Sequence, residues 1–161
     1  MIICGIDPGL DGALAFLVDG TIAVFDMPTL RLSRNRTAKR EIDAHLLADR
    51  IEEMRPMQAF VELANAMPKQ GTASMFAFGK GYGVVIGVLA ALQVPVSFVP
   101  PQRWKKALRV PAAKDGARAR ASQLMPSAAC NWPLVKHDGR AEAALIAYYG
   151  ALDNRGDSRP E

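Results

Sequence analysis

The chain of 161 residues contains only two cysteines and two histidines. Cys4 and Cys130 form no C-x-x-C pair, so the sequence excludes a structural zinc site and a disulfide-stapled scaffold. Long apolar runs are also missing. The longest, at 84–92, is far shorter than the roughly 20 residues that a membrane-spanning helix needs, and the first residues lack the pattern of a signal peptide. We therefore expect a cytoplasmic protein with no membrane partner.

Acidic residues are scarce in the middle of the chain. The whole chain has 16 acids and a net charge of +4, yet the only acid between Leu63 and His137 is Asp115. That segment has ten bases and a net charge of +9, and a second run, 31–40, has five bases and no acid. Such clusters are typical of proteins that bind a phosphodiester backbone, although a solvated basic face without a ligand has the same composition.

The remaining composition is that of a folded protein, because 50% of the residues are hydrophobic and 22% are charged. This length is usual for one domain. We predict a single domain at 1–153 and a polar tail at 154–161.

Short apolar runs and turn residues predict the order of the elements. Asp19-Gly20 is a favoured hairpin turn, and Gly79, Gly81, Gly83 and Gly87 lie in an otherwise helical segment, where they permit close packing or the approach of a ligand. We expect loops at 31–40 and 126–133, strands at 2–6, 13–18, 21–25, 57–63 and 94–99, and helices at 42–54, 75–92, 102–108, 114–125 and 138–152. This order predicts an α/β domain with a mixed, five-stranded sheet flanked by helices.

Two carboxylates follow apolar strands. Asp7 ends the run Gly5-Ile6-Asp7 before Pro8-Gly9, and Glu62 ends the run 59–62. A buried carboxylate is costly unless it is paired or coordinated, although Asp7 in Asp-Pro-Gly has the alternative role of capping a turn.

Two further acids lie on the predicted last helix, where Asp138 and Glu142 share a face with Leu145, Ile146 and Tyr149. Asp138 has the alternative role of helix N-cap, and Glu142 that of an ion pair with Arg140 or Arg118. Four converging carboxylates repel one another unless a divalent cation neutralises them. Oxygen ligands favour Mg²⁺ or Mn²⁺, and two such ions suit phosphoryl transfer to water.

The Gly-Ile-Asp-Pro-Gly strand, the Val-Glu strand end and the late Asp-Gly-Arg-Ala-Glu-Ala-Ala-Leu-Ile-Ala helix together resemble the RuvC-type Holliday junction resolvases of the RNase H-like superfamily. The segments 66–71, 74–79, 82–83 and 100–106 are most similar to the bacteriophage and chloroplast branch. The resemblance covers nearly the whole chain. It implies an RNase H-like fold and a homodimeric, Mg²⁺-dependent endonuclease that nicks four-way DNA junctions. Such an enzyme acts in DNA recombination and repair. Its expected location is the cytoplasm of a bacterial or phage-infected cell, or an organelle.

Asp7 and Glu62 match the first two acids of the family. Relatives often have their last acidic pair three residues apart, whereas Asp138 and Glu142 are four apart, and the surrounding alanines align Glu142 with the last acid. Either Asp138 or His137 supplies the remaining ligand or a proton relay, and a hard metal favours Asp138. The resemblance thus gives Asp7, Glu62, Asp138 and Glu142 as catalytic residues and ligands of two Mg²⁺ ions.

The segment 67–82 resembles the junction-binding surface of the family. Phe76 and Phe78 are candidates either for stacking on unpaired bases or for core packing, and Trp104 either contacts DNA or anchors its helix. The other candidate DNA contacts are polar or basic: Lys69, Gln70, Ser74, Lys80, Lys105, Lys106, Arg118 and Arg120.

Three other functions compete with junction cleavage. An RNase H-like nuclease of hybrids or flaps would use the same carboxylates. A DNA-structure-binding module without catalysis would not need all of them. An ATP-binding protein of the actin and sugar-kinase type also has a Gly-Ile-Asp strand, but this chain is too short for the second domain of such proteins.

Overall fold

Residues 1–34, 37–63 and 71–156 are described by a computed structural model of the chain. Its main sheet is mixed and has the strand order β3-β2-β1-β6-β7. The first three strands form an antiparallel meander, and β6 and β7 are added parallel to β1. The five strands are β1 (Ile2–Asp7), β2 (Ala13–Val18), β3 (Thr21–Asp26), β6 (Gln58–Glu62) and β7 (Val96–Val99). The predicted five-stranded mixed sheet is confirmed.

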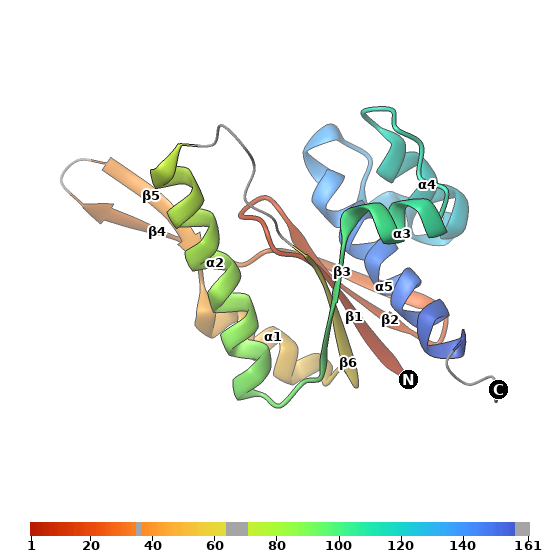
Figure 1. The fold of residues 1–161 in the computed structure, drawn as a ribbon, viewed down its shortest axis with the longest axis horizontal. Coiled ribbons are helices and arrows are strands. Elements are labelled where there is room, and N and C mark those ends of the chain that lie inside the picture. The colour runs from red at the N-terminus through yellow and green to blue at the C-terminus, as the bar shows by residue number, and fades with distance from the viewer. Residues whose placement is uncertain (35–36, 64–70, 157–161) are drawn as a thin grey trace.

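Helices cover both faces of this sheet (Figure 1). One face carries α3 (Pro101–Ala107), α4 (Gly116–Leu124) and α5 (Asp138–Gly156), and the other carries α1 (Ala44–Met54) and α2 (Thr72–Ala91). Two short 3₁₀ helices, η1 (Pro126–Asn131) and η2 (Val135–His137), connect α4 to α5.

The alternation of side chains along β1 and β2 divides the core into two halves. Ile3, Ala13 and Ala15 point to the α5 side, whereas Cys4 and Leu14 belong to the core under α1 and α2. Helix α5 packs directly on β1, where a Cβ atom at Gly5 would lie 2.2 Å from the backbone nitrogen of Ala147. The carboxyl end of β1 therefore has the start of α5 as a close neighbour.

The local rules for turns and caps hold in the first half of the chain. Asp19 and Gly20 both have positive φ, 47° and 87°, as a type I′ hairpin turn requires. Asp43 caps α1 by accepting hydrogen bonds from the backbone nitrogens of His45 and Leu46 at 3.0 and 3.1 Å.

The prediction of a loop at 31–40 is wrong. The chain forms a second, two-stranded sheet from β4 (Thr29–Arg34) and β5 (Thr37–Ile42), which projects from the body of the protein beside α2 (Figure 1). The loop expected at 126–133 mostly forms η1. The last helix extends to Gly156, past the predicted start of the tail. The remaining tail residues, 157–161, lie outside the described part.

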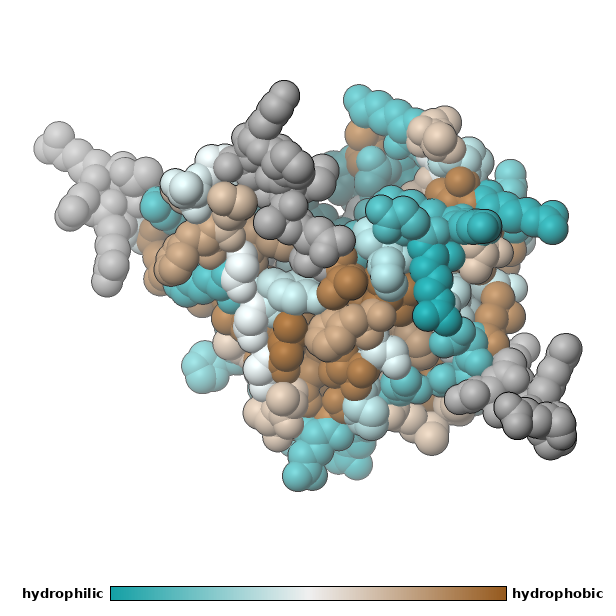
Figure 2. All heavy atoms as spheres, in the orientation of Figure 1, coloured by the Kyte–Doolittle hydropathy of each residue, from teal (hydrophilic) through white to brown (hydrophobic). Residues whose placement is uncertain are grey.

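Helix α2 is apolar but mostly exposed. Of its 20 residues, only Val85 and Leu89 are buried, and apolar side chains gather on the face of the molecule over α2 and between α2 and α3 (Figure 2). By length and composition alone this helix is long and apolar enough to cross a membrane. The sequence did not indicate this, because its longest apolar run, at 84–92, is shorter than a membrane span. A Cβ atom added to the glycine at 79, 83 or 87 would have nothing within 4 Å, whereas Gly81 packs on Ile42.

Candidate active site

Three of the predicted acids meet at the carboxyl ends of β1 and β6. Asp7 ends β1, Glu62 ends the neighbouring parallel strand β6, and Glu142 lies in the second turn of α5. Their electrostatic coupling is direct, because Glu142 and Glu62 both raise the pKa of Asp7, and Glu142 raises that of Glu62. We refer to Asp7, Glu62 and Glu142 as the acid cluster.

Asp7 is held in a narrow position between the turn after β1 and the start of α5. A Cβ atom at Gly139 would lie 2.9 Å from Oδ2 of Asp7 and 2.5 Å from the carbonyl oxygen of Asp11. Only glycine fits there. Burial, with the charges of Glu142 and Glu62, raises the pKa of Asp7 from 3.8 to about 7.

Glu62 is oriented by an indole. The ring nitrogen Nε1 of Trp104 donates a hydrogen bond to Oε2 of Glu62 at 2.9 Å, and Trp104 is completely buried in the core beneath α3. Burial and the charge of Glu142 raise the pKa of Glu62, while the hydrogen bond from Trp104 acts in the opposite direction. Of the two roles considered for Trp104, the structure gives it that of a helix anchor, and adds contact with the acid cluster.

Lys105 is the cation of the acid cluster. Its Nζ lies 2.9 Å from Oε1 of Glu142. Burial lowers the pKa of Lys105. The hydrogen bond to Glu142 and the negative charges of Glu142, Glu62 and Asp7 together raise it by more, so the net shift is upward. The sequence indicated Lys105 only as a DNA contact. Arg140 and Arg118, which were the predicted ion-pair partners of Glu142, bond to Asp26 and Asp138 instead.

Asp138 lies one turn before Glu142 but has a different partner. Nε of Arg118 on α4 donates to Oδ1 of Asp138 at 2.6 Å. Asp138 has helical backbone angles at the first position of α5, so it is part of the helix rather than its extended N-cap. The main charges that shift the pKa of Asp7 are instead those of the other two members of the acid cluster and of Lys105.

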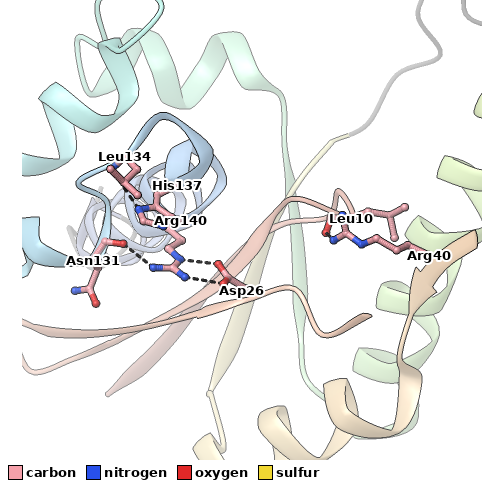
Figure 3. Close-up of polar contacts among 7 residues, drawn as sticks. All are labelled: Leu10, Asp26, Arg40, Asn131, Leu134, His137 and Arg140. Carbon is pink, nitrogen blue, oxygen red and sulfur yellow. Dashed lines mark hydrogen bonds and ion pairs between the residues drawn. The ribbon is translucent and has the colours of Figure 1, made fainter. Parts of the chain in front are cut away.

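His137 lines a different cleft from the groove of Glu142 and Asp138. Its Nδ1 accepts a hydrogen bond from the backbone nitrogen of Leu134 at 3.3 Å (Figure 3). The lining of its cleft also includes Leu10 and Arg40. Partial burial and the positive charges of Arg140 and Lys136 lower the pKa of His137. This placement favours Asp138 over His137 as the fourth member of the site, as the donor preference of a hard metal also does.

A groove of about 650 Å³ leads to the acid cluster between α3, α4 and the start of α5. We call it the catalytic groove. Asp138 and Glu142 form one wall, and the basic residues on its lining are Lys105 and Lys114. A groove that joins lysines to carboxylates suits an anionic substrate whose bond is cleaved at the acids.

The other predicted DNA contacts have varied surroundings. Ser74, Phe76 and Lys106 are exposed, and Phe76 keeps 76% of its surface accessible. Phe78 is less exposed, at 39%, and its ring stacks on that of Tyr82 with centroids 6.3 Å apart. Lys69 and Gln70 lie outside the described residues.

Three of the predicted basic contacts are committed to protein partners. Lys80 on α2 forms an ion pair with Glu41 on β5. Arg118 pairs with Asp138. Nε of Arg120 donates to the carbonyl oxygen of Leu108 at 2.6 Å, which ties α4 to the end of α3.

The donor chemistry of the site fits a hard divalent cation. All four acids supply carboxylate oxygens. Burial first, and then the charge of neighbouring carboxylates, raise the pKa of Asp7 and Glu62, and a bound cation would offset both effects. As the side chains are arranged, no three His, Cys, Asp or Glu groups within the described ranges are close enough together to hold a metal ion. Glu142 and Asp138 instead bond to Lys105 and Arg118.

A search of solved structures finds the same arrangement of elements in RuvC of Thermus thermophilus in complex with a Holliday junction substrate. The TM-score is 0.64 over 98% of this chain and 97% of that chain, with 17% sequence identity. The chain has the fold of RuvC. A second T. thermophilus RuvC structure is 19% identical, with a TM-score of 0.59 over 98% of both chains.

This likeness confirms the predicted RNase H-like fold. A fowlpox virus resolvase in complex with Holliday junction DNA is 15% identical over 94% of this chain and 99% of that one, with a TM-score of only 0.41. No protein-family model and no curated protein matches the chain. The narrower resemblance to the bacteriophage and chloroplast branch stays a prediction.

Proposed function

We propose that the chain is a structure-selective endodeoxyribonuclease that resolves four-way DNA junctions by metal-dependent phosphodiester hydrolysis. One observation carries this proposal. The RuvC fold brings Asp7, Glu62 and Glu142 together at the ends of β1 and β6 and on α5, although they are far apart in sequence. Burial and the charges of neighbouring members raise the pKa of Asp7 and Glu62. The solved RuvC with this fold is bound to a Holliday junction substrate.

The residues that would hold the metal are Asp7, Glu62, Glu142 and Asp138. Oxygen ligands select Mg²⁺, with Mn²⁺ as a substitute, and the number of carboxylates supports two ions. When bound, such ions activate a water molecule and stabilise the departing 3′-oxygen of the phosphodiester. The chain would then act in DNA recombination and repair, in the cytoplasm of a bacterial or phage-infected cell or in an organelle.

The protein's own side chains position the reacting groups. Trp104 fixes the carboxylate of Glu62 through its indole hydrogen bond. Lys105 balances part of the negative charge of the acid cluster and lines the catalytic groove, so it is placed to contact a phosphate that enters there. Lys114 and Lys106 extend this positive surface along the groove and α3.

Phe76 is the better candidate for stacking on an unpaired base. It lies in the first turns of α2 with 76% of its surface accessible, and an aromatic side chain that stacks on a base contributes roughly 1–3 kcal/mol to binding. Phe78 already stacks on Tyr82 of the same helix, so it is less available than Phe76 to stack on a base. Lys69, Gln70 and Ser74 belong to the same predicted junction surface.

A homodimer joined through α2 accounts for the exposed apolar face of that helix. Gly79, Gly83 and Gly87 are spaced by four residues, with open space beside each of them, so a second helix is able to approach closely along this line. Two copies related by a two-fold axis would present two acid clusters to the two opposed strands of a junction.

A cleavage panel tests the proposed function. Wild-type protein and Glu62→Gln are incubated with a mobile junction, a fixed junction, linear duplex, a flap and an RNA–DNA hybrid, each with Mg²⁺ and with EDTA. We expect nicks confined to junctions, dependent on Mg²⁺ and absent with Glu62→Gln, which keeps junction binding within a few-fold because no basic contact is removed. Preferred cleavage of hybrids or flaps would support the rival nuclease, and binding without cleavage would support the non-catalytic module.

A further inference from the structure

The hairpin formed by β4 and β5 is strongly basic. Residues 29–42 include five bases, and their only acid is Glu41. By contrast, residues 1–28 contain four acids and no base, and residues 43–63 contain more acids than bases. The hairpin is therefore a local concentration of positive charge between two acidic stretches of the chain.

The strand register places like charges beside one another. Arg31 on β4 is directly opposite Arg40 on β5, and Lys39 is opposite Leu32. Directly opposed like charges weaken a strand pair. Arg31 and Lys39 are exposed and form no ion pair with any residue that the structure describes. The charges of Arg31 and Lys39 are therefore available to an anionic partner.

Contacts at its base fix the hairpin relative to the active site. Nη1 and Nη2 of Arg40 donate to Oδ1 of Asp11 at 2.7 Å and to the carbonyl oxygen of Leu10 at 2.6 Å. These acceptors lie in the turn that follows Asp7, and Arg40 points into that turn (Figure 3). On the other side, Glu41 pairs with Lys80 of α2. Isolated two-stranded hairpins are marginally stable in water, so these contacts give the hairpin a defined direction.

A cleft of about 320 Å³ lies at the base of the hairpin. Its lining includes Arg40, Lys136 and Arg140, with Asp11 and Asp26 as the acids. Two nitrogens of the Arg140 guanidinium, Nε and Nη2, donate to Asp26 at 2.6 Å (Figure 3). Lys136 is exposed and has no ion-pair partner in the described residues. Lys136 thus adds a positive charge between the hairpin and the start of α5.

We infer that the hairpin is a second DNA-binding element, which holds the phosphodiester backbone of a junction arm on the side of the acid cluster opposite α3 and α4. This inference rests on the proposed function and adds a substrate contact to it. In Figure 1 the hairpin and α2 lie on one side of β1 and β6, and α3 and α4 lie on the other. A DNA arm that crosses the strand ends thereby meets positive charge on both sides. An anionic membrane is the less favoured partner, because Leu32 is the only large apolar side chain of the described hairpin residues that is exposed.

Salt-dependent binding of a labelled four-way junction in EDTA tests the inference. The variants are Arg31→Gln, the double variant R31Q/K39Q and the control Arg55→Gln, which removes an exposed charge from the end of α1. Each lost phosphate contact reduces the slope of log K against log salt by about 1. We expect a reduction of about 1 for Arg31→Gln and up to about 2 for the double variant, with several-fold weaker binding at physiological salt and no change for Arg55→Gln.

The cleavage rate at saturating protein separates this inference from the proposed function. We expect R31Q/K39Q to keep that rate in Mg²⁺, because the acid cluster is intact. If wild-type protein binds and nicks junctions but the salt slope of R31Q/K39Q is unchanged, the hairpin assignment is wrong and the proposed function stands. If wild-type protein does not bind the junction, both fail. Loss of binding to phosphatidylglycerol vesicles in R31Q/K39Q, with an unchanged DNA slope, would assign the hairpin to membranes instead.

Discussion

At the scale of single residues, Asp7 makes the metal-free protein sensitive to pH. Its pKa is about 7 in the folded chain, against an ordinary 3.8, so the folded state retains a proton that the unfolded state releases. The protonated form of Asp7 favours the folded state. This contribution to the free energy of unfolding is fully present below about pH 4 and is lost as the pH rises through about 7. One pKa unit is equivalent to about 1.4 kcal/mol, which gives a loss of on the order of 4 kcal/mol.

We therefore expect wild-type protein in EDTA to unfold at a lower temperature at about pH 8 than at about pH 5, and Asp7→Asn to reduce this difference strongly. Thermal unfolding across this pH range measures both. Asp115→Asn is the control, because Asp115 is exposed and makes no side-chain cap bond to α4. Equal pH dependence of Asp7→Asn and wild type would show that the charge on Asp7 is not destabilising.

Trp104 allows a second test at this scale. Trp104→Phe keeps an aromatic ring in the core but removes the donor to Glu62. A hydrogen bond to a charged group is worth roughly 1.5–3 kcal/mol, so we expect cleavage at saturating junction to slow by about 10- to 100-fold if the whole effect is expressed in the rate. Junction binding should stay within a few-fold.

Trp132→Phe provides a matched control for that variant. Trp132 is also buried, and its indole nitrogen donates to Oγ of Ser122 at 2.9 Å, away from the acid cluster. Both variants lose a buried hydrogen bond and therefore stability, but only Trp104→Phe should lose activity. A similar loss of activity in both would reduce Trp104 to a structural role.

The sequence predicts the acids better than their partners. Asp7 and Glu62 follow apolar strands, and parallel neighbours bring such strand ends together, so their meeting is a consequence of local pattern and topology. The pairing of Glu142 with Lys105 and of Asp138 with Arg118 depends on how α3 and α4 pack against α5. That packing is long-range, and nothing in the spacing of the residues distinguishes these bases from Arg140, which bonds to Asp26 instead.

At the scale of elements, the basic hairpin shows a limit of pattern-based prediction. Strands are recognised by alternating apolar residues that face a core, but residues 31–40 alternate mainly among bases and small polar residues. The strands are held by backbone pairing and by contacts at the base of the hairpin, which the sequence pattern does not contain. Regular elements with one buried face were predicted, apart from their exact bounds.

The glycines of α2 give a prediction with opposite effects on the monomer and the dimer. Gly83 has open space beside it, and glycine in a helix is roughly 1 kcal/mol less favourable than alanine. Gly83→Leu should therefore not destabilise the monomer, yet its side chain would keep a second α2 helix at a distance. We expect a shift from dimer to monomer in sedimentation analysis, with an unchanged or raised melting temperature at low concentration.

Ala119→Leu is the control for the added side chain, because Ala119 is exposed on α4. It should leave the association state unchanged. A stable Gly83→Leu dimer would show that the copies associate through another surface. If detergent dissociates the wild-type protein and changes nothing in Gly83→Leu, a membrane-bound α2 helix is favoured instead.

At the scale of the whole molecule, fold and charge together support junction cleavage more strongly than either does alone. The RuvC fold positions the carboxylates at one end of the sheet, and the basic hairpin lies on the opposite side of that end from α3 and α4, which carry Lys105, Lys106 and Arg118. One domain provides one acid cluster. In the proposed homodimer each copy cuts one of the two opposed strands, so the product should depend on how many intact clusters a dimer has.

Mixed dimers test this dependence on a supercoiled plasmid with an extruded cruciform. Two nicks across the junction give linear DNA, whereas one nick releases the supercoils and gives an open circle. Wild-type protein should yield mainly linear DNA, and Glu62→Gln should yield neither product because it lacks an acid in each cluster. An equal mixture, re-equilibrated so that subunits exchange, should contain about half mixed dimers by random pairing of two-fold dimers, each able to nick once. We expect open circles to accumulate in that mixture, as measured by gel electrophoresis. If the mixture yields only linear DNA at a reduced rate, one acid cluster cuts both strands in turn and the two-site dimer is wrong.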